Sequence, residues 1–366
     1  METKKLEPLS IFSLGLFFLV LGGSLFAVIS WIIQTKASLS GFWSLPLGLL
    51  QLEITISSLL ISLLGGLIFR RKIFISCFLI NLLLLFSPYS LSASQSAKGI
   101  SILSWNVSGT KKQTDTQQEK LPCITSYLSE WKKGKERQII LLQEVPKSHK
   151  THFERELDMK CTWSHYLCED KNCNGLLTCA DHDWKINRER QRPFRSGQRY
   201  GFQQLELEDK PTNQKINVLN IHLESLWRTI ASFPNIKRSG TPLEMLRDNP
   251  NPKLLLKVLE KNAQNQRIEI DEVFEVLNQL QDPTLFAGDF NSPPSLWIHR
   301  ALREQYQDAH VKTGNGFGHT TSRFDVLQAR IDYLYASAQL NWTGNTTVDH
   351  STLCSDHFPV QSSFSW

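Results

Sequence analysis

A long apolar stretch at the N-terminus constrains this chain most. Residues 8–90 consist of apolar runs with almost no charge, whereas from Lys98 onward the sequence has the mixed polarity of an ordinary soluble domain. A bilayer core is about 30 Å thick and needs roughly 20 apolar residues to span it as a helix. We therefore expect a membrane anchor with a short linker over residues 1–97, and we exclude a wholly soluble cytosolic protein.

Three segments of this region are long enough to cross a bilayer. The expected spans are residues 9–33, 47–69 and 73–89, of which the third is the shortest. An anchor with only two true spans is the alternative. The small residues after residue 89 are also typical of a signal-peptide cleavage region, but no clean A-x-A site is present.

The basic residues predict how the anchor is oriented, because Lys and Arg are retained on the cytoplasmic side. Lys4 and Lys5 precede the first span, and the run at 70–72 separates the second span from the third. Three spans then place the following domain on the extracytoplasmic face, most simply the periplasmic side of a bacterial inner membrane. Two spans would place it in the cytoplasm, and only Lys36 argues against the first orientation.

The cysteines give an independent indication of the compartment. Four of them cluster as C-x6-C-x4-C-x5-C between residues 161 and 179. A zinc site would normally show closer C-x2-C or Cys/His spacing, so we favour one or two disulfides and an oxidising compartment. The pairing cannot be read from the sequence. The six cysteines after the anchor are Cys123, Cys161, Cys168, Cys173, Cys179 and Cys354.

The region after the anchor carries little net charge. Only six of the 40 basic and three of the 35 acidic residues precede Lys98, which leaves about +2 on the rest of the chain. This near-neutral balance speaks against an avid, sequence-indifferent nucleic-acid binder. The length of residues 98–366 suits one large domain with a sizeable core.

Short β-rich runs separated by helical patterns predict an α/β domain. Several runs are apolar on both alternating faces, which is typical of strands buried between layers. Residues 267–280 place apolar side chains at helical spacing, and Asp282-Pro283 ends that pattern. The expected strands are 100–107, 138–145, 175–180, 201–208, 216–224, 284–291, 329–337 and 358–364.

Two segments of this domain are harder to interpret. Residues 226–262 form an irregular insert with turn signals, in which LLLKVLEK at 254–261 is a candidate helix. We interpret the insert as a surface excursion, with a lid or membrane-facing flap as the alternative. A basic stretch between two strands is interpreted as a solvated loop, although it could bind nucleic-acid phosphates or anionic lipid headgroups. Its residues are Lys185, Arg188, Arg190, Arg192, Arg195 and Arg199.

Polar residues appear at the ends of the expected strands in an ordered series. Each one alone has a structural explanation, such as a turn-capping Asn or a satisfied core His. Placed together at strand ends, they predict a shared cleft. The series is Asn106, Glu144, His222, Asp289, Asn291, Asp332, Asp356 and His357.

This series resembles the endonuclease/exonuclease/phosphatase family over residues 98–366. The most specific pieces are GDFN at 288–291 and SDHFPV at 355–360, and SWNV, QE, NIHL and RIDYLY follow the expected order. The resemblance implies a four-layer α/β sandwich, in which two central mixed sheets are flanked by helices. It also implies cleavage of phosphoester bonds with a divalent cation, Mg²⁺ or alternatively Mn²⁺.

The resemblance assigns a role to each residue of the series. Oxygen donors suit Mg²⁺, so Glu144 is the main expected metal ligand, with Asn106 and Asp356 beside it. The expected catalytic residues are Asp289 and Asn291 at the attacking water, His357 at the phosphate, Asp332 orienting His357, and His222 at the phosphate or the leaving group.

We therefore expect a membrane-anchored phosphoesterase. The N-x-H-L form at 220–223 resembles sphingomyelinases, inositol-polyphosphate phosphatases and deadenylases more than apurinic-site endonucleases. A phosphodiester substrate is favoured, in a lipid headgroup or a nucleic acid, and no protein partner is inferred. The alternative is a non-catalytic envelope protein that retains the fold as a binding scaffold.

Overall fold

The computed structural model describes residues 99–107, 117–165, 174–196, 200–233, 252–294, 296–314, 318–321, 329–352 and 354–366. Residues 90–292 and 301–366 belong to one compact unit. The expected spans at 9–33, 47–69 and 73–89 lie outside the described residues, so the expected anchor at 1–97 is not tested. Among the residues that are described, no helix is long and apolar enough to cross a membrane.

The first sheet has seven strands in the order β11-β13-β1-β2-β4-β3, and β12 pairs with β13 beside this path. Strands β1 and β2 are parallel at its centre, and their neighbours are antiparallel. The strands are β1 (Ile100–Asn106), β2 (Gln138–Pro146), β3 (Lys160–His165), β4 (Asn174–Ala180), β11 (Asn341–Trp342), β12 (Thr347–Val348) and β13 (Val360–Ser365).

The second sheet has six strands in the order β5-β6-β7-β8-β10-β9. Its central pair, β7 and β8, is again parallel, and the other pairs are antiparallel. The strands are β5 (Trp184–Pro193), β6 (Gly201–Asp209), β7 (Gln214–His222), β8 (Thr284–Asp289), β9 (Gln307–Asp308) and β10 (Asp332–Ala336).

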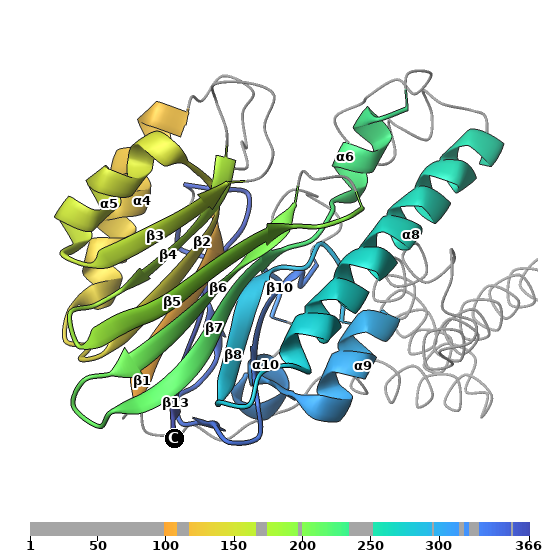
Figure 1. The fold of residues 1–366 in the computed structure, drawn as a ribbon. Helices are drawn as coiled ribbons and strands as arrows, with labels where there is room; N and C mark the ends of the chain where they lie inside the picture. Colours follow the sequence, from red (N-terminus) through yellow and green to blue (C-terminus); the bar gives the residue numbers. More distant parts are fainter. Residues whose placement is uncertain are drawn as a thin grey trace, which may run out of the picture. The chain divides into compact units, whose positions relative to one another are not determined.

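Helices cover the sheets from outside (Figure 1). Helices α4 and α5 lie over the first sheet, and the long helix α8 lies over the second. The helices are α4 (Gln117–Lys132), η2 (Lys147–His149), α5 (Lys150–Leu157), α6 (Leu226–Ala231), α8 (Pro252–Leu277), α9 (Trp297–Gln305) and α10 (Ala309–Thr313).

Alternating side chains of β1 and β2 build two separate cores. Ile102 and Leu141 pack between the sheets with residues of β6, β7 and β8. Leu103, Leu142 and Trp105 point the other way and pack with residues of α4 and α5. Both faces of these strands are therefore buried, which explains why their sequences are continuous apolar runs. The expected α/β architecture of two mixed sheets with flanking helices is confirmed.

Two disulfides lie within the described residues, which confirms the expectation from the cysteine count. Cys161 and Cys179 are directly opposite each other on β3 and β4. The second bond joins Cys123 and Cys354, which are 231 positions apart in the chain. Cys168 and Cys173 lie outside the described residues.

Two elements differ from the sequence-based expectation. Helix α8 runs from Pro252 to Leu277, so it joins the end of the insert at 226–262 to the expected helix at 267–280, which ends three residues early. The basic stretch is not a loop over most of its length, because Lys185 through Arg192 belong to β5, an edge strand. Edge strands tolerate charged side chains since one side of their backbone faces solvent. Because so many residues of β5 are charged, its sequence lacks the alternating apolar pattern by which a strand is recognised.

Candidate active site

The parallel pair at the centre of each sheet positions the site. In parallel strands the carboxyl ends meet at one edge of the sheet, and polar side chains placed there share a crevice. Asn106 ends β1 and pairs with Gln143 of β2, directly before Glu144. His222 ends β7 and pairs with Asp289 at the end of β8. Two sheets packed face to face thus bring these side chains together.

Asp289 is the centre of this cluster, and its side chain is buried. Its Oδ2 accepts a hydrogen bond from Asn106 Nδ2 at 3.0 Å. The same oxygen lies 3.5 Å from His222 Nε2 and 3.7 Å from His357 Nε2. Its Oδ1 accepts from the backbone N–H of Asn291 at 2.8 Å. Within the described part of the chain, no Lys or Arg ion pair neutralises this carboxylate.

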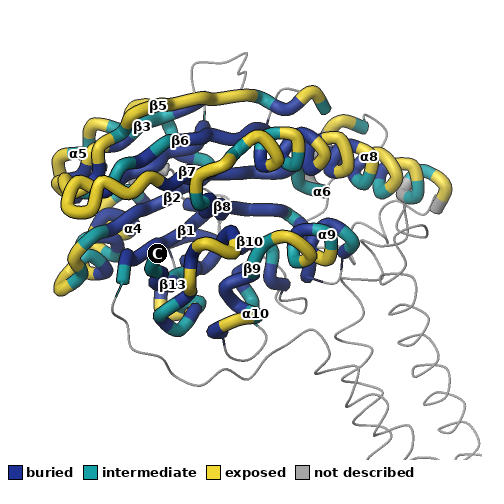
Figure 2. Tube along the Cα trace, turned by 60° about the horizontal axis from the view of Figure 1, so that its bottom comes forward, coloured by how far each residue is buried: buried dark blue, intermediate teal, exposed yellow. Residues whose placement is uncertain are grey.

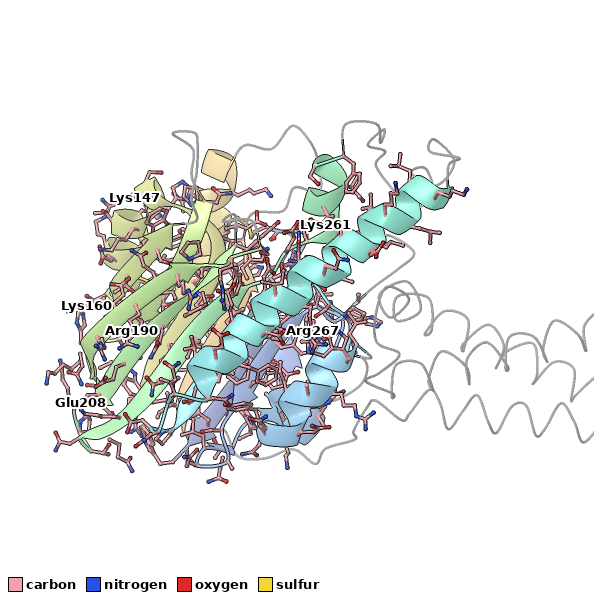
Figure 3. All side chains as sticks on the ribbon, turned by 45° about the vertical axis from the view of Figure 1, so that its right-hand side comes forward. Lys147, Lys160, Arg190, Glu208, Lys261 and Arg267 are labelled. Atoms are coloured by element: carbon pink, nitrogen blue, oxygen red, sulfur yellow. A yellow bond between two sulfur atoms is a disulfide. The ribbon has the colours of Figure 1, made fainter. Side chains whose placement is uncertain are left out.

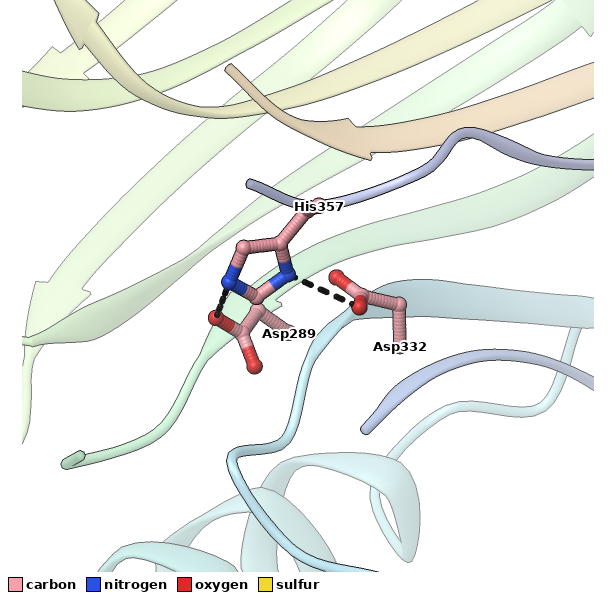
Figure 4. A group of neighbouring side chains, drawn as sticks. All are labelled: Asp289, Asp332 and His357. Carbon is pink, nitrogen blue, oxygen red and sulfur yellow. Dashed lines mark hydrogen bonds and ion pairs between the residues drawn. The ribbon is translucent and has the colours of Figure 1, made fainter. Parts of the chain in front are cut away.

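His357 lies between two carboxylates (Figure 4). Its Nδ1 is 2.9 Å from Asp332 Oδ2, and its Nε2 faces Asp289. Asp332 begins β10 and is paired with Asp289 across the antiparallel ladder, so the sheet fixes their separation. The backbone carbonyl of His357 accepts a hydrogen bond from Trp105 Nε1 at 2.9 Å. The imidazole is thereby held in one position.

The charges in the cluster depend on one another. Burial raises the pKa of Asp289 to about 7, although the nearby His357 opposes this shift. Burial alone would lower the pKa of His357, but the carboxylates of Asp332 and Asp289 outweigh it and raise this pKa to about 10. His357 is therefore a cation at neutral pH, which suits it to bind a phosphate oxygen.

Glu144 extends from an irregular part of β2. The pairing of β2 with β4 shifts between Leu142 and Val145, and Glu144 has a positive φ of 59°. Such bulges redirect a side chain, here toward the site. Its side chain is 24% exposed, and Oε1 lies 3.4 Å from Asn106 Nδ2 and 3.9 Å from His222 Nε2. Glu144 is thus the solvent-accessible carboxylate at the rim of the cluster.

Asn291 and Asp356 lie in loops beside the cluster. Asn291 has a positive φ of 48°, and its Nδ2 donates to the backbone carbonyl of Leu223 at 2.8 Å. This bond uses one of the two N–H groups of the amide and holds the side chain, whose Oδ1 can accept a hydrogen bond from a water. Asp356 is buried directly before His357, and the neighbouring Ser355 Oγ donates to the carbonyl of Asn106 at 2.8 Å. The structure thus places all eight residues of the predicted series at or beside one site.

Some residues around the site were not found by sequence reasoning. The ring of Tyr200 packs edge-on against His222 with 4.7 Å between centroids. Gln266 of α8 donates to the backbone carbonyls of Glu224 at 2.8 Å and Asn291 at 3.2 Å. Neither residue belongs to a strand-end motif. A buried glutamine inside an amphipathic helix has no signal in a single sequence that separates it from an exposed one.

Several of these residues can hold a metal ion. Asp289, Asp332 and His357 each offer a ligand atom, and these atoms lie within 4.8 Å of one another. This grouping differs from the expected ligand set of Glu144, Asn106 and Asp356. The raised pKa of His357, about 10, keeps a proton on both ring nitrogens at neutral pH in the metal-free protein, and a protonated nitrogen has no lone pair for a metal. The oxygen donors on the Glu144 side suit a hard cation such as Mg²⁺ better.

Fold and site together define a two-sheet α/β protein with a buried Asp–His cluster at the carboxyl ends of its central parallel strands. Residues 227–357 match the model of the Endonuclease/Exonuclease/phosphatase family. The matched stretch covers about a third of the chain and includes Asp289, Asp332 and His357. No curated protein sequence matches the chain.

Solved structures show the same fold at low sequence identity. The human Nocturnin catalytic domain with bound sulfate is 16% identical, with a TM-score of 0.52, covering 74% of this chain and 96% of its own. An endonuclease/exonuclease/phosphatase from Bacteroides vulgatus is 13% identical, with a TM-score of 0.51, covering 73% and 99%. The Bacteroides thetaiotaomicron mannosyl-6-phosphatase Bt3783 is 14% identical, with a TM-score of 0.50, covering 73% and 100%. At such identities the likeness concerns the fold.

Proposed function

We propose that this protein is a divalent-metal-dependent phosphoesterase that hydrolyses phosphodiesters of a nucleic acid or a lipid headgroup. One observation carries the proposal. Asp289 is buried with His222 and His357 within 3.7 Å of one carboxylate oxygen, and His357 is held by Asp332 at 2.9 Å. A base, a proton donor and a phosphate-binding cation are the groups that hydrolysis of a phosphate ester requires.

The donor set fits a divalent cation. Glu144, Asn106 and Asp356 would hold it through oxygen atoms, and Asp289 has no Lys or Arg counter-ion within the described residues. The bound cation would neutralise the non-bridging phosphate oxygens and polarise the ester.

The protein's own groups then divide the proton transfers. Asp289 takes a proton from the attacking water, and Asn291 positions that water through its side-chain oxygen. The protonated His357 binds the phosphate, and Asp332 keeps its ring oriented. His222 gives a proton to the leaving oxygen, so one diester and one water yield a monoester and an alcohol.

The names of similar proteins agree with phosphate chemistry. One similar structure is called a mannosyl-6-phosphatase, and another contains a sulfate, which has the shape and charge of phosphate. We favour a diester because the N-x-H-L form, which places His222 beside Asp289, resembles the position where phosphodiesterase members of the family carry a histidine. The leaving oxygen of a phosphate ester departs as an alkoxide that needs a proton, and His222 can supply it.

We also propose that the catalytic domain lies on the extracytoplasmic side of a membrane. The bonds Cys123–Cys354 and Cys161–Cys179 support an oxidising compartment. Thiol alkylation on intact and lysed cells tests this location. A domain in the cytoplasm would carry these four cysteines as thiols that react only after lysis.

The decisive experiment measures hydrolysis by the full-length protein with Mg²⁺, with Mn²⁺ and with EDTA. The substrates are bis-p-nitrophenyl phosphate, p-nitrophenyl phosphate, sphingomyelin and single-stranded DNA. Asp289→Asn should reduce the rate about 10²–10⁴-fold, as expected for loss of a general base. Full activity in EDTA or in this variant would refute the proposal, and the order of the four substrates assigns the ester class.

A further inference from the structure

A hollow lies on the outer face of the second sheet, away from the candidate active site. Its volume is about 650 Å³, and β5, β6, β7 and the last turns of α8 line it. Asn217 lines the hollow and precedes His222 by five positions on β7. Since side chains alternate along a strand, these two residues project from opposite faces of the sheet. The hollow is therefore separate from the catalytic cluster.

One wall of the hollow is a row of arginines on β5. Arg188, Arg190 and Arg192 occupy alternate positions, so they share one face and follow each other at about 6.6 Å. Figure 3 labels Arg190 on the sheet beside α8, and Figure 2 shows that β5 is exposed along much of its length. This row is the central part of the basic stretch seen in the sequence.

Two of the three guanidinium groups are available for a ligand. Arg192 lies 3.5 Å from the buried carboxylate of Glu272. Arg188 and Arg190 form no ion pair with any acidic side chain in the described ranges of the chain, and both are exposed. They are a pair of uncompensated cations at the rim of a concave surface.

The acidic residues of the hollow do not cancel this charge. Glu206 is paired with Lys215 at 3.3 Å, and Glu275 is paired with Arg195 at 2.9 Å. Asp282, in the turn after α8, is the remaining carboxylate on the lining, and it forms no ion pair with Arg188 or Arg190. Glu206 lies opposite Arg188 on the ladder of β5 and β6, but its ion pair is with Lys215, so the guanidinium groups of both arginines remain without an ion-pair partner among the described residues.

Protection of a sheet edge explains only part of this arrangement. Charged residues on an edge strand deter pairing with another chain, and Lys185 of β5 is such a residue outside the hollow. Edge protection does not require that arginines gather on one face over a hollow that also contains carboxamides. The lining carboxamides are Gln191, Gln204, Asn217, Gln279 and Gln281.

We infer that this hollow is a second anion-binding site, and that it takes a phosphorylated polyol. Arg188 and Arg190 bind the phosphate, because the guanidinium fork matches phosphate oxygens in pairs. The carboxamides donate to and accept from the hydroxyl groups. The volume of about 650 Å³ falls within the roughly 300–1,000 Å³ of small-molecule sites. A free sugar phosphate and a phosphoinositide headgroup share this chemistry.

Titration calorimetry on the full-length protein tests this site. The soluble probes are fructose 1,6-bisphosphate and inorganic phosphate, both in EDTA to weaken binding at the catalytic cluster. The variant is Arg188→Ala with Arg190→Ala, and the matched control is Arg155→Ala, an exposed arginine on α5. We expect the affinity for fructose 1,6-bisphosphate to fall at least tenfold in the double variant and to stay unchanged in Arg155→Ala and Asp289→Asn.

Vesicle sedimentation distinguishes the two sources of the ligand. Phosphatidylcholine vesicles with and without phosphatidylinositol 4-phosphate are the probes. Binding that needs this lipid and both arginines assigns a lipid headgroup, and binding of the soluble bisphosphate alone assigns a free sugar phosphate. Hydrolysis of bis-p-nitrophenyl phosphate should be the same in the double variant and the wild type.

Three results would overturn the inference. The first is equal affinity for fructose 1,6-bisphosphate in the wild type and in a double variant that circular dichroism shows to be folded. The second is no binding of either soluble probe at millimolar concentration, together with no lipid-dependent sedimentation. The third is arginine-dependent binding of a single-stranded oligonucleotide alone, which would make the row a nucleic-acid contact.

Discussion

At the scale of single residues, the two buried carboxylates of the site, Asp332 and Asp289, have different surroundings. Asp332 directly contacts the imidazole of His357, whereas Asp289 shares one oxygen among Asn106, His222 and the far side of that imidazole. The first carboxylate fixes a charge on the histidine, and the second remains available as a base. Pairs of titratable groups with unlike surroundings are how one site supplies both an acid and a base.

The raised pKa of His357 predicts how stability depends on pH. In metal-free protein, the protonated ring stabilises the fold fully below its unfolded value near 6.5, and this contribution is lost as the pH rises through about 10. The difference in free energy of unfolding between wild type and His357→Gln should therefore shrink from pH 6.5 to 10. Urea denaturation measures it, and His182→Gln, an exposed histidine, is the control. A constant difference would contradict the charged dyad.

The two possible sets of metal ligands predict opposite effects of two substitutions. If Glu144 holds the cation, Glu144→Gln should weaken Mn²⁺ binding more than tenfold, and Asp332→Asn should mainly lower kcat. If the group Asp289, Asp332 and His357 holds it, Asp332→Asn should abolish binding. Titration calorimetry with Mn²⁺ separates these outcomes. Equal affinity in the wild type and Glu144→Gln would exclude Glu144 as a ligand.

The sequence could predict the site residues because each lies at or beside one end of a buried strand. Asn106, His222 and Asp289 end apolar runs, and strand ends in parallel sheets converge. The use of their atoms could not be predicted in the same way. The side-chain nitrogen of Asn291 donates a hydrogen bond to the backbone carbonyl of Leu223, and this bond depends on how two loops pack in space.

At the scale of elements, α8 does more than cover the second sheet. Several polar residues on its buried face bond to backbone groups of the loops that follow β5, β7 and β8. Glu269 accepts from the backbone N–H of Glu224, and Glu272 accepts from that of Arg195. Gln266 bonds to both loops that carry the site. A rigid helix thus fixes the backbone on which Asp289 and Asn291 depend.

This contact makes Gln266 a positioning residue whose loss should affect catalysis. Gln266→Met keeps the volume and removes the donor to the carbonyls of Glu224 and Asn291. We expect kcat to fall about 10–100-fold, because small displacements of catalytic groups are costly, while KM changes little. Gln264→Met, on the exposed face of the same helix, should retain the wild-type kcat. If Gln266→Met changes only KM or the free energy of unfolding and keeps the wild-type kcat, the role of Gln266 is only structural.

Elements were predictable where their patterns followed burial. The central strands β1, β2, β7 and β8 lie where apolar runs placed them, since both their faces are covered. Strand β5 was missed because an edge strand over solvent carries charge instead of alternating apolar residues. The helical piece LLLKVLEK at 254–261 was recognised, but the turn signals beside Pro252 obscured that it and the helix expected from residue 267 form one helix, α8.

At the scale of the whole molecule, parts that are distant in sequence must be joined to form the site. The N-terminal strand β1 pairs with the C-terminal strand β13, and buried Gln143 of the first sheet donates to Asn220 of the second at 2.8 Å. The sequence indicated two sheets but contained no signal for this polar link. It gave no signal for the pairing of Cys123 with Cys354 either.

The bond between Cys123 and Cys354 should support both stability and catalysis. It closes a span of 231 residues, against 18 for Cys161 and Cys179. Loop-closure entropy grows with span, so removing either bond should cost about 2–5 kcal/mol of unfolding free energy, and the longer one should cost more. Cys354 also lies three positions before His357, which it ties to α4.

We therefore expect the variant Cys123→Ser with Cys354→Ser to lose stability and kcat together. Cys161→Ser with Cys179→Ser is the matched control. It removes the bond between β3 and β4, and neither of these strands contains a residue of the candidate site. Urea denaturation and hydrolysis of bis-p-nitrophenyl phosphate measure the two effects on the same samples. If both variants keep the wild-type kcat below their unfolding transitions, the loop of His357 holds its position without the bond. If only the first variant loses kcat, the disulfide connects the redox state of the compartment to the geometry of the site.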